Sequence, residues 1–207
     1  MNLTVYAGTF NPIHTGHLIM AEAVRDAFDL KELLFIPSYI PPHRNDCLIN
    51  PYDRLRMVEL AIEDNSAYKV SDIEFDRDDK SYSYDTVKQL LEENPEYDKV
   101  NFIIGTDAFR FIDNWYKIDE LVKMVNFIIV SRPDSSEIDA IFDQIELKNY
   151  NYQLIKAPLI DISSSFIRDR IKNGKSIKYL VPKEVESYIN RNKLYKTSDI
   201  CRLSYGH

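Results

Sequence analysis

The sequence predicts an α/β fold, a doubly wound parallel sheet of about six strands with helices on both faces. Short apolar runs alternate along the chain with amphipathic helical patterns. The runs at 100–104 and 126–130 are apolar apart from one asparagine each, as buried parallel strands are. Alternation of this kind implies a parallel sheet covered on both sides. Ligands of such sheets bind beyond the carboxyl ends of the strands.

In the first half of the chain, three strands alternate with three helices. We expect strands at 3–7, 33–37 and 69–75, and helices at 17–28, from 51 onward and at 83–91. The first helix is supported by apolar residues at helical spacing, namely Leu18, Ala21, Val24 and Phe28. Asn50 is a typical N-cap for the helix that begins at Pro51.

The second half supplies the remaining strands at 100–104, 126–130 and 153–155. A helix is expected to start near Ser163 or Ser164 and to stop around Asn173-Gly174, and a last helix to run from Pro182 to about Asn192. With no repeat and no linker in the sequence, we expect residues 1–195 to form one domain. The tail at 196–207 has no pattern and is either disordered or a short piece of something longer.

Composition narrows the class of protein. The 207 residues carry a net charge of −7, which argues against a broad nucleic-acid surface because such binding depends on neutralising phosphates. No apolar run approaches the ~20 residues needed to span a bilayer. Cys47 and Cys201 match no metal spacing and, because the N-terminus enters a strand without a secretory leader, indicate a cytoplasmic protein. The oligomeric state stays open, and a homo-oligomer is compatible with the sequence.

Residues 8–18 form a strand–turn–helix corner that holds two histidines, His14 and His17. Glycines at 8 and 16 allow backbone to approach a ligand closely. Free N–H groups at the helix start favour an anion, and both imidazoles can donate hydrogen bonds to phosphate oxygens. The corner therefore suits a nucleotide triphosphate.

Other interpretations of this corner are weaker. A bare His-x-x-His is as often a pair of surface residues or a helix cap, but here a strand, two glycines and Pro12 accompany it. A zinc site would need further ligands, and no cysteine cluster supplies them. The run is not a P-loop, because no Gly-Lys-Ser/Thr follows the glycines. We therefore expect no protein-held metal.

The run at 162–168, Ile-Ser-Ser-Ser-Phe-Ile-Arg, is a second candidate for phosphate binding. Ser164 and Ser165 stand where a helix begins, and Arg168 follows about one turn later. One serine with one arginine would indicate only an N-cap and a solvent-facing side chain. Three hydroxyls with a guanidinium fork fit phosphate binding better.

Together the two runs resemble the Gly-x-Phe-x-Pro-x-His-x-Gly-His and Ile-Ser-Ser-Thr-x-Ile-Arg signatures of the nucleotidyltransferase superfamily related to class I aminoacyl-tRNA synthetases. The resemblance implies a Rossmann-like fold that activates the α-phosphate of ATP. Gly8, Thr9, Phe10 and Gly16 would then contact ATP. The chain departs from the commoner pattern in three places, which are Ala7 for Gly, Asn11 for Asp and Ser165 for Thr.

Three middle motifs are similar to those of bacterial nicotinate mononucleotide adenylyltransferases. They are Pro-Pro-His-Arg at 41–44, Ser-Tyr-Asp-Thr at 83–86, and Gly-Thr-Asp at 105–107 followed by Trp115 and Tyr116. Taken alone, the first motif indicates a surface loop and the second a helix cap, while Trp115 would more often be core. Asp107 is equally a helix cap or a ribose ligand approached past Gly105.

The resemblance gives several of these residues roles in binding the mononucleotide. Trp115 would stack on the pyridine ring, and Thr86 with the backbone near Tyr116 would hold the nicotinate carboxylate. Arg44, which stands where the family has Lys, would touch phosphate; a planar guanidinium differs in geometry from an ammonium group.

The implied reaction is ATP plus nicotinate mononucleotide giving nicotinate adenine dinucleotide and pyrophosphate, with substrate-bound Mg²⁺. His14 and His17 would contact the α and β phosphates, and Ser164, Ser165 and Arg168 the β and γ phosphates. Alternatives are a phosphopantetheine adenylyltransferase and a non-catalytic nucleotide sensor of the same fold. Length, acidity and the absence of a Lys-Met-Ser-Lys-Ser run disfavour an aminoacyl-tRNA synthetase. The choice between nicotinate and nicotinamide mononucleotide stays open.

Overall fold

The computed structural model describes residues 2–42, 48–77, 79–131, 150–158 and 160–196. Six strands form one parallel sheet in the order β3-β2-β1-β4-β5-β6. The strands are β1 (Leu3–Gly8), β2 (Leu33–Pro37), β3 (Tyr68–Val70), β4 (Val100–Gly105), β5 (Val125–Ser131) and β6 (Tyr152–Lys156). The chain starts in the middle, runs to one edge and returns to β4. The strand order therefore reverses between β1 and β4, where ligands of such sheets bind.

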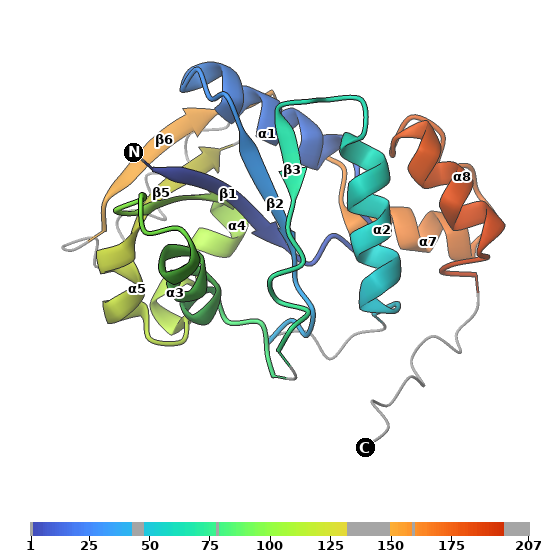
Figure 1. Cartoon of the computed structure of the whole chain (residues 1–207). Helices are drawn as coiled ribbons and strands as arrows, with labels where there is room; N and C mark the ends of the chain where they lie inside the picture. Colours follow the sequence, from blue (N-terminus) through green and yellow to red (C-terminus); the bar gives the residue numbers. More distant parts are fainter. Residues whose placement is uncertain (1, 43–47, 78, 132–149, 159, 197–207) are drawn as a thin grey trace.

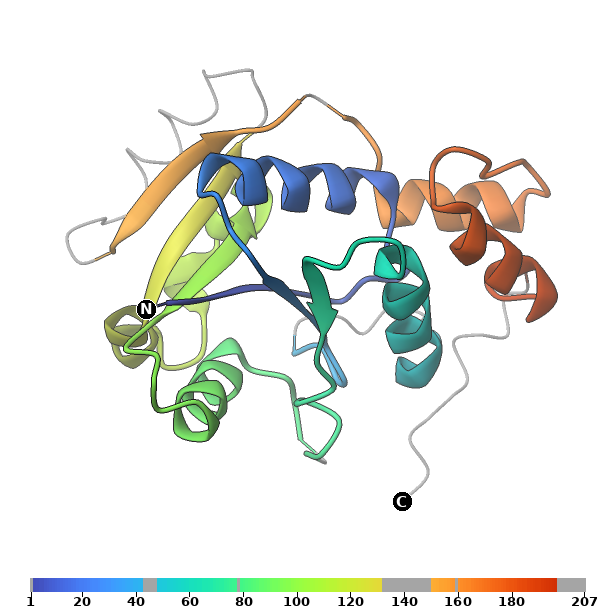
Figure 2. The ribbon, with the colours of Figure 1, turned by 45° about the horizontal axis from the view of Figure 1, so that its top comes forward.

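Helices cover both faces of this sheet (Figures 1 and 2). One face packs against α1 (Thr15–Ala27), α2 (Pro51–Ile62), α7 (Ser164–Lys172) and α8 (Lys183–Arg191). The other packs against α3 (Ser83–Glu93), α4 (Thr106–Phe109), the short 3-10 turn η1 (Ile112–Asn114) and α5 (Ile118–Met124). The predicted parallel, doubly wound architecture is confirmed.

Successive residues of the central strands belong to two different cores. Phe102 and Ile104 pack with the α3 side, whereas Ile103 between them packs with the α1 side. In β5, Ile129 likewise packs opposite to its neighbour Ile128. Because side chains alternate across a strand and both faces are covered, successive positions such as Phe102, Ile103 and Ile104 are all apolar. This explains the largely apolar runs in the sequence.

Local signals placed most helix ends correctly. The Asn50 side chain accepts a hydrogen bond from the Tyr52 backbone N–H at 2.9 Å, as expected of an N-cap. The α7 helix has Ser163 as its N-cap and ends at Asn173, before Gly174 with φ +65°. These ends depend on capping chemistry between neighbouring residues, which a sequence displays directly.

Two predictions differ from the structure. The strand expected at 69–75 is only Tyr68–Val70, because the chain turns at once: the Phe75 N–H donates to the Asp72 carbonyl at 2.7 Å. The short helices α4 and α5 had no predicted counterpart from periodicity. In α5 only Leu121 is buried, too little to give a helical pattern.

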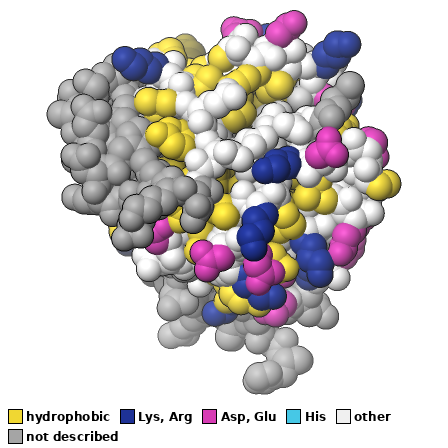
Figure 3. Space-filling view, turned by 90° about the vertical axis from the view of Figure 1, so that its left-hand side faces the viewer, with side chains coloured by type: hydrophobic (Ala, Val, Ile, Leu, Met, Phe, Trp, Pro, Cys, Tyr) yellow, Lys and Arg dark blue, Asp and Glu magenta, His cyan; other side chains and the backbone are white. Residues whose placement is uncertain are grey.

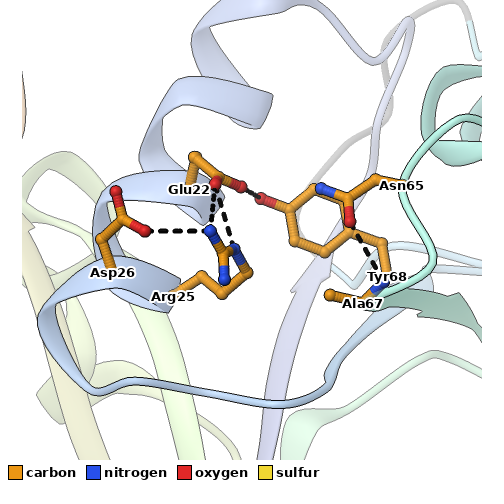
Figure 4. A network of polar contacts seen from close by, with 6 residues as sticks. All are labelled: Glu22, Arg25, Asp26, Asn65, Ala67 and Tyr68. Atoms are coloured by element: carbon orange, nitrogen blue, oxygen red, sulfur yellow. Dashed lines mark hydrogen bonds and ion pairs between the residues drawn. The ribbon is translucent and has the colours of Figure 1, made fainter.

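Polar contacts tie α1 to the edge strand β3 (Figure 4). Glu22 accepts hydrogen bonds from Arg25, at 2.6 Å to Nη2, and from the Tyr68 hydroxyl. Arg25 also pairs with Asp26 at 2.9 Å. Half-exposed ion pairs of this type contribute little free energy of folding. We therefore assign this network to the alignment of α1 with β3 rather than to stability.

The surface drawn in Figure 3 carries Lys and Arg side chains interspersed with Asp and Glu. Charges of one sign do not gather into a single field on that face, in agreement with the modest net charge. None of the helices that the structure describes is long and apolar enough to cross a bilayer.

The buried strand β5 gives a direct test of this core. Ile129 is 1% exposed, so Ile129→Ala should lower the free energy of unfolding by about 2–5 kcal/mol through lost burial and a cavity. Leu154→Ala on β6, where the side chain is 40% exposed, should cost less than about 1 kcal/mol. Denaturant unfolding of both variants measures the difference, and equal losses would contradict the assigned core.

Candidate functional site

The two histidines form one unit where β1 passes into α1. His14 is the N-cap of α1, and its backbone N–H donates to Nδ1 of His17 at 3.2 Å. The two rings stack with centroids 3.6 Å apart and planes 25° apart. Because Nδ1 accepts this bond, a neutral His17 carries its hydrogen on Nε2, which makes that atom a donor.

His14 is the buried member of the pair. It is 6% exposed, and burial lowers the pKa of its imidazole to about 4. The ring is therefore neutral at physiological pH and offers a hydrogen-bond donor rather than a charge. A Cβ at Gly16 would stand 3.0 Å from His14 Nδ1. Only glycine at this position leaves the ring undisturbed.

Phe10 holds His17 from the other side. Its ring meets the His17 imidazole edge to face at 5.2 Å and also contacts Tyr6 and Phe35 in the core. Phe10 has φ 46°, an unusual backbone conformation for a residue with a side chain. The aromatic contacts that bury this ring fix the direction in which His17 points.

The late serine–arginine cluster lies against this same corner, as predicted. Ser164 Oγ donates to the Pro12 carbonyl at 2.9 Å, and Arg168 Nη1 donates to the Asn11 carbonyl at 2.9 Å. Arg168 Nη2 also donates to Ser165 Oγ at 3.1 Å. None of the three lines either of the two described cavities. The bonds from Ser164 and Arg168 hold the loop at Asn11 and Pro12, which the sequence did not predict.

Tyr195 is a further residue of the corner that sequence reasoning missed. Its hydroxyl donates to Asn11 Oδ1 at 2.9 Å, and both residues are buried. Burial also raises the pKa of the Tyr195 phenol, so it remains a donor. No local pattern links positions 184 residues apart. The contact accounts for asparagine at position 11 as an uncharged acceptor.

A cleft of about 730 Å³ opens at the carboxyl ends of the central strands, within the range of ligand sites. It brings together seven of the predicted site residues, namely Gly8, Thr9, Phe10, His17, Gly105, Trp115 and Tyr116. A second cavity, of about 80 Å³, shares Gly105 with the cleft and is lined by three more, which are His14, Gly16 and Asp107. The stacked histidines thus stand between the two spaces.

The far end of the cleft is aromatic. Trp115 packs edge to face on Phe102, with centroids 6.0 Å apart, and also lines the cleft. It therefore packs on the core and also faces the cleft, which leaves its predicted role in stacking a prediction. The exposed Tyr116 ring lies 4.5 Å from that of Tyr82, which sequence reasoning did not single out as a cleft residue.

Two predicted residues are placed differently, and a third cannot be compared. The hydroxyl of Thr86 is buried, donates to Glu74 Oε1 at 2.7 Å, accepts from Arg77 at 2.7 Å and does not line the cleft. Asp107 is not the N-cap of α4, because Gly105 occupies that position. Arg44 lies outside the described residues, as do both cysteines.

Comparison with known proteins agrees with this geometry. The family model for cytidylyltransferase-like proteins matches residues 5–170. A probable nicotinate-nucleotide adenylyltransferase from Geobacillus thermodenitrificans is 42% identical over 192 residues, which are 92% of this chain and 84% of that protein. Another from Lactiplantibacillus plantarum is 41% identical over 199 residues, 94% and 88% of the two chains.

The chain belongs to the nicotinate-nucleotide adenylyltransferase family. A solved Plasmodium falciparum nicotinic acid mononucleotide adenylyltransferase, complexed with NaAD, superposes with a TM-score of 0.78. The two are 23% identical, with 94% of this chain and 97% of that chain covered. This likeness shows that the family member described here has the same fold.

The buried His14 ring makes the stability of the protein depend on pH. Since its pKa is about 4 when folded and about 6.5 when unfolded, the unfolded chain takes up the proton first as pH falls. The wild type should lose about 2 kcal/mol more unfolding free energy between pH 7 and pH 5 than His14→Asn does. Denaturant melts at both pH values measure this, and parallel losses would contradict a buried neutral His14.

Proposed function

We propose that this chain, a nicotinate-nucleotide adenylyltransferase of NAD biosynthesis, joins ATP and nicotinate mononucleotide in the described cleft and releases pyrophosphate. The stacked His14–His17 pair carries the proposal, because it stands where the strand order reverses and separates the cleft from the smaller cavity. The α-phosphate of ATP would lie against this histidine pair. The mononucleotide would occupy the aromatic end.

Direct displacement fits the groups that the cleft offers. The attacking mononucleotide phosphate is already an anion, so no general base is needed. Catalysis would come from alignment and from donors aimed at the charge on the α-phosphate and the departing pyrophosphate. His17 Nε2–H is such a donor, and the neutral His14 is the second. Both imidazoles are preorganised by stacking and by the backbone bond to His17.

On the ATP side, Gly8, Thr9, Phe10 and Gly16 would approach the phosphates, and Asp107 beside Gly105 would meet the ribose. The first turn of α7, with Ser164, Ser165 and Arg168, would hold the β and γ phosphates. Its contacts with the Asn11 and Pro12 carbonyls support this placement. To reach phosphate, the Arg168 fork would exchange part of that contact.

Mg²⁺ would be held by phosphate oxygens and water. Among the described residues, no group of three or more His, Cys, Asp or Glu side chains could hold a metal ion. Asn11, which accepts from Tyr195, brings no negative charge to the phosphates. When bound, the ion would neutralise charge on the pyrophosphate.

On the mononucleotide side, Trp115 would stack on the pyridine ring and Tyr116 would lie near its carboxylate, because both line the cleft. Thr86 would approach that carboxylate from behind the cleft wall. The Thr86 hydroxyl donates to Glu74, so contact with a carboxylate requires this hydroxyl to turn. Arg44 would touch phosphate from the loop that follows Pro42.

The proposed reaction is tested by pyrophosphate release with ATP and one acceptor at a time. Nicotinate mononucleotide should support turnover at least about tenfold better than nicotinamide mononucleotide, because neutral donors at helix starts favour a carboxylate. Reactions without acceptor give the background. Preferred use of phosphopantetheine would indicate the alternative transferase. If none of the acceptors raises pyrophosphate release above the background, the chain would be a nucleotide-binding protein without this activity.

Substitution of His17 tests the assignment of the donor. His17→Ala should lower kcat by about 100-fold or more and change the KM for the mononucleotide by less than about threefold, because the lost contact belongs to the transition state. Steady-state kinetics with each substrate varied separates the two effects. A variant with unchanged kcat would remove His17 from the chemistry.

A further inference from the structure

The loop at 38–42, which follows β2, forms part of the wall of the cleft. Ser38, Pro41 and Pro42 line the cleft on this loop. The loop leaves β2 beside β1, whose own end carries the phosphate-binding corner at Thr9. The position of the loop therefore sets the distance between the corner and the cleft wall at Ser38, Pro41 and Pro42, which we call the mononucleotide wall.

One side of this loop is held by Arg54 of α2, which is fully buried. Its Nη1 donates to the Thr9 carbonyl at 2.9 Å and to the Ser38 carbonyl at 2.5 Å. Its Nη2 donates to the Tyr39 carbonyl at 2.9 Å. A single planar guanidinium thus joins the backbone after β1 to the backbone after β2. The fork geometry matters, because an ammonium group could not reach all three carbonyls in fixed directions.

The other side of the loop is held by Glu74, which is 3% exposed and lines the cleft. Its Oε2 accepts from the Tyr39 N–H at 3.3 Å. Ser81 Oγ accepts from the N–H groups of Tyr39 at 2.9 Å and Ile40 at 3.1 Å, and Ser81 also hydrogen-bonds to Glu74. Thr86 donates to the remaining oxygen at 2.7 Å.

The backbone N–H and the carbonyl of Tyr39 are therefore both hydrogen-bonded to buried side chains, one acidic and one basic. The N–H faces Glu74 and Ser81, and the carbonyl faces Arg54. Burial raises the pKa of Glu74, while its hydrogen bonds and the nearby Arg77 oppose that rise. Because hydrogen-bond donors point at both carboxylate oxygens of Glu74, neither oxygen can be replaced by another donor without loss of a hydrogen bond.

We propose that Arg54 and Glu74 are positioning residues for adenylyl transfer, which act from opposite sides on the 38–42 loop and set the mononucleotide wall against the phosphate-binding corner. This inference rests on the proposed function. In-line attack tolerates little misalignment, since a shift of about 1 Å can cost about 100-fold in rate. Arg54 joins the backbone after β1 to the backbone after β2 and therefore acts on the alignment of the two substrates. Of these two segments, Glu74 contacts only the one after β2, through Tyr39.

Two conservative variants separate these effects. Glu74→Gln keeps the size of the side chain but turns an NH₂ group toward converging donors, and should raise the KM for nicotinate mononucleotide about tenfold while the KM for ATP changes less than about twofold. Arg54→Lys keeps the charge but loses the fork, and should lower kcat about tenfold or more. Both are measured by pyrophosphate release, with thermal melting to confirm folding.

The double variant gives the sharper readout. Because both side chains act through Tyr39, its loss of kcat/KM should be at least about threefold smaller than the product of the single losses. Independent, multiplicative losses would overturn the inference, as would a Glu74→Gln variant that raises both KM values equally. A general loss of stability would instead lower the fraction of folded enzyme and with it the apparent kcat, and thermal melting detects this.

Matched controls come from exposed positions on or beside α2. Arg56→Lys and Glu63→Gln should both retain wild-type kinetics.

If Glu74→Gln does not fold, Ser81→Ala takes its place. This substitution removes the hydroxyl that accepts hydrogen bonds from two loop N–H groups, and it should shift the KM for nicotinate mononucleotide. An unshifted KM overturns the inference. Inactive wild type and controls would reject the proposed function and this inference with it, whereas active controls beside unaffected variants would reject the inference alone.

Discussion

The hydrogen bond from the His14 backbone to the His17 ring is the contact on which the site depends. It joins the first residue before α1 to the third residue within it, so both imidazoles move as one body. Phe10 confines that body on one side, and Gly16 leaves it room on another. The orientation of two donors is thus fixed by backbone geometry before a ligand arrives, which is the arrangement that electrostatic stabilisation of a transition state requires.

In the proposed reaction, an acidic chain of net charge −7 would accommodate two anionic substrates through local dipoles more than through overall charge. Imidazole donors, helix starts and backbone N–H groups would attract phosphate without an extended positive surface. The buried guanidinium of Arg54 adds a cation close to the cleft, since two of the carbonyls that it bonds belong to the cleft residues Thr9 and Ser38.

Much of the fold was predictable because its signals are local. Largely apolar runs predicted β4 and β5, and the caps at Asn50 and Ser163 predicted two helix starts. The motif at 8–18 likewise predicted the strand–turn–helix corner at which both histidines lie. Contacts between distant segments left no such trace: neither Glu74 nor Tyr195 stands in a pattern that distinguishes it from a surface residue. Their importance comes from burial and partners, which depend on how α2, α3 and the chain end pack together.

The bond from Tyr195 to Asn11 joins residues that are 184 positions apart in the chain. During synthesis β1 and its corner leave the ribosome long before the residue that secures Asn11. The nascent chain thus carries an incompletely anchored corner until Tyr195 has emerged. A product cut short before this tyrosine would retain every signature motif and still lack the tether that closes the corner.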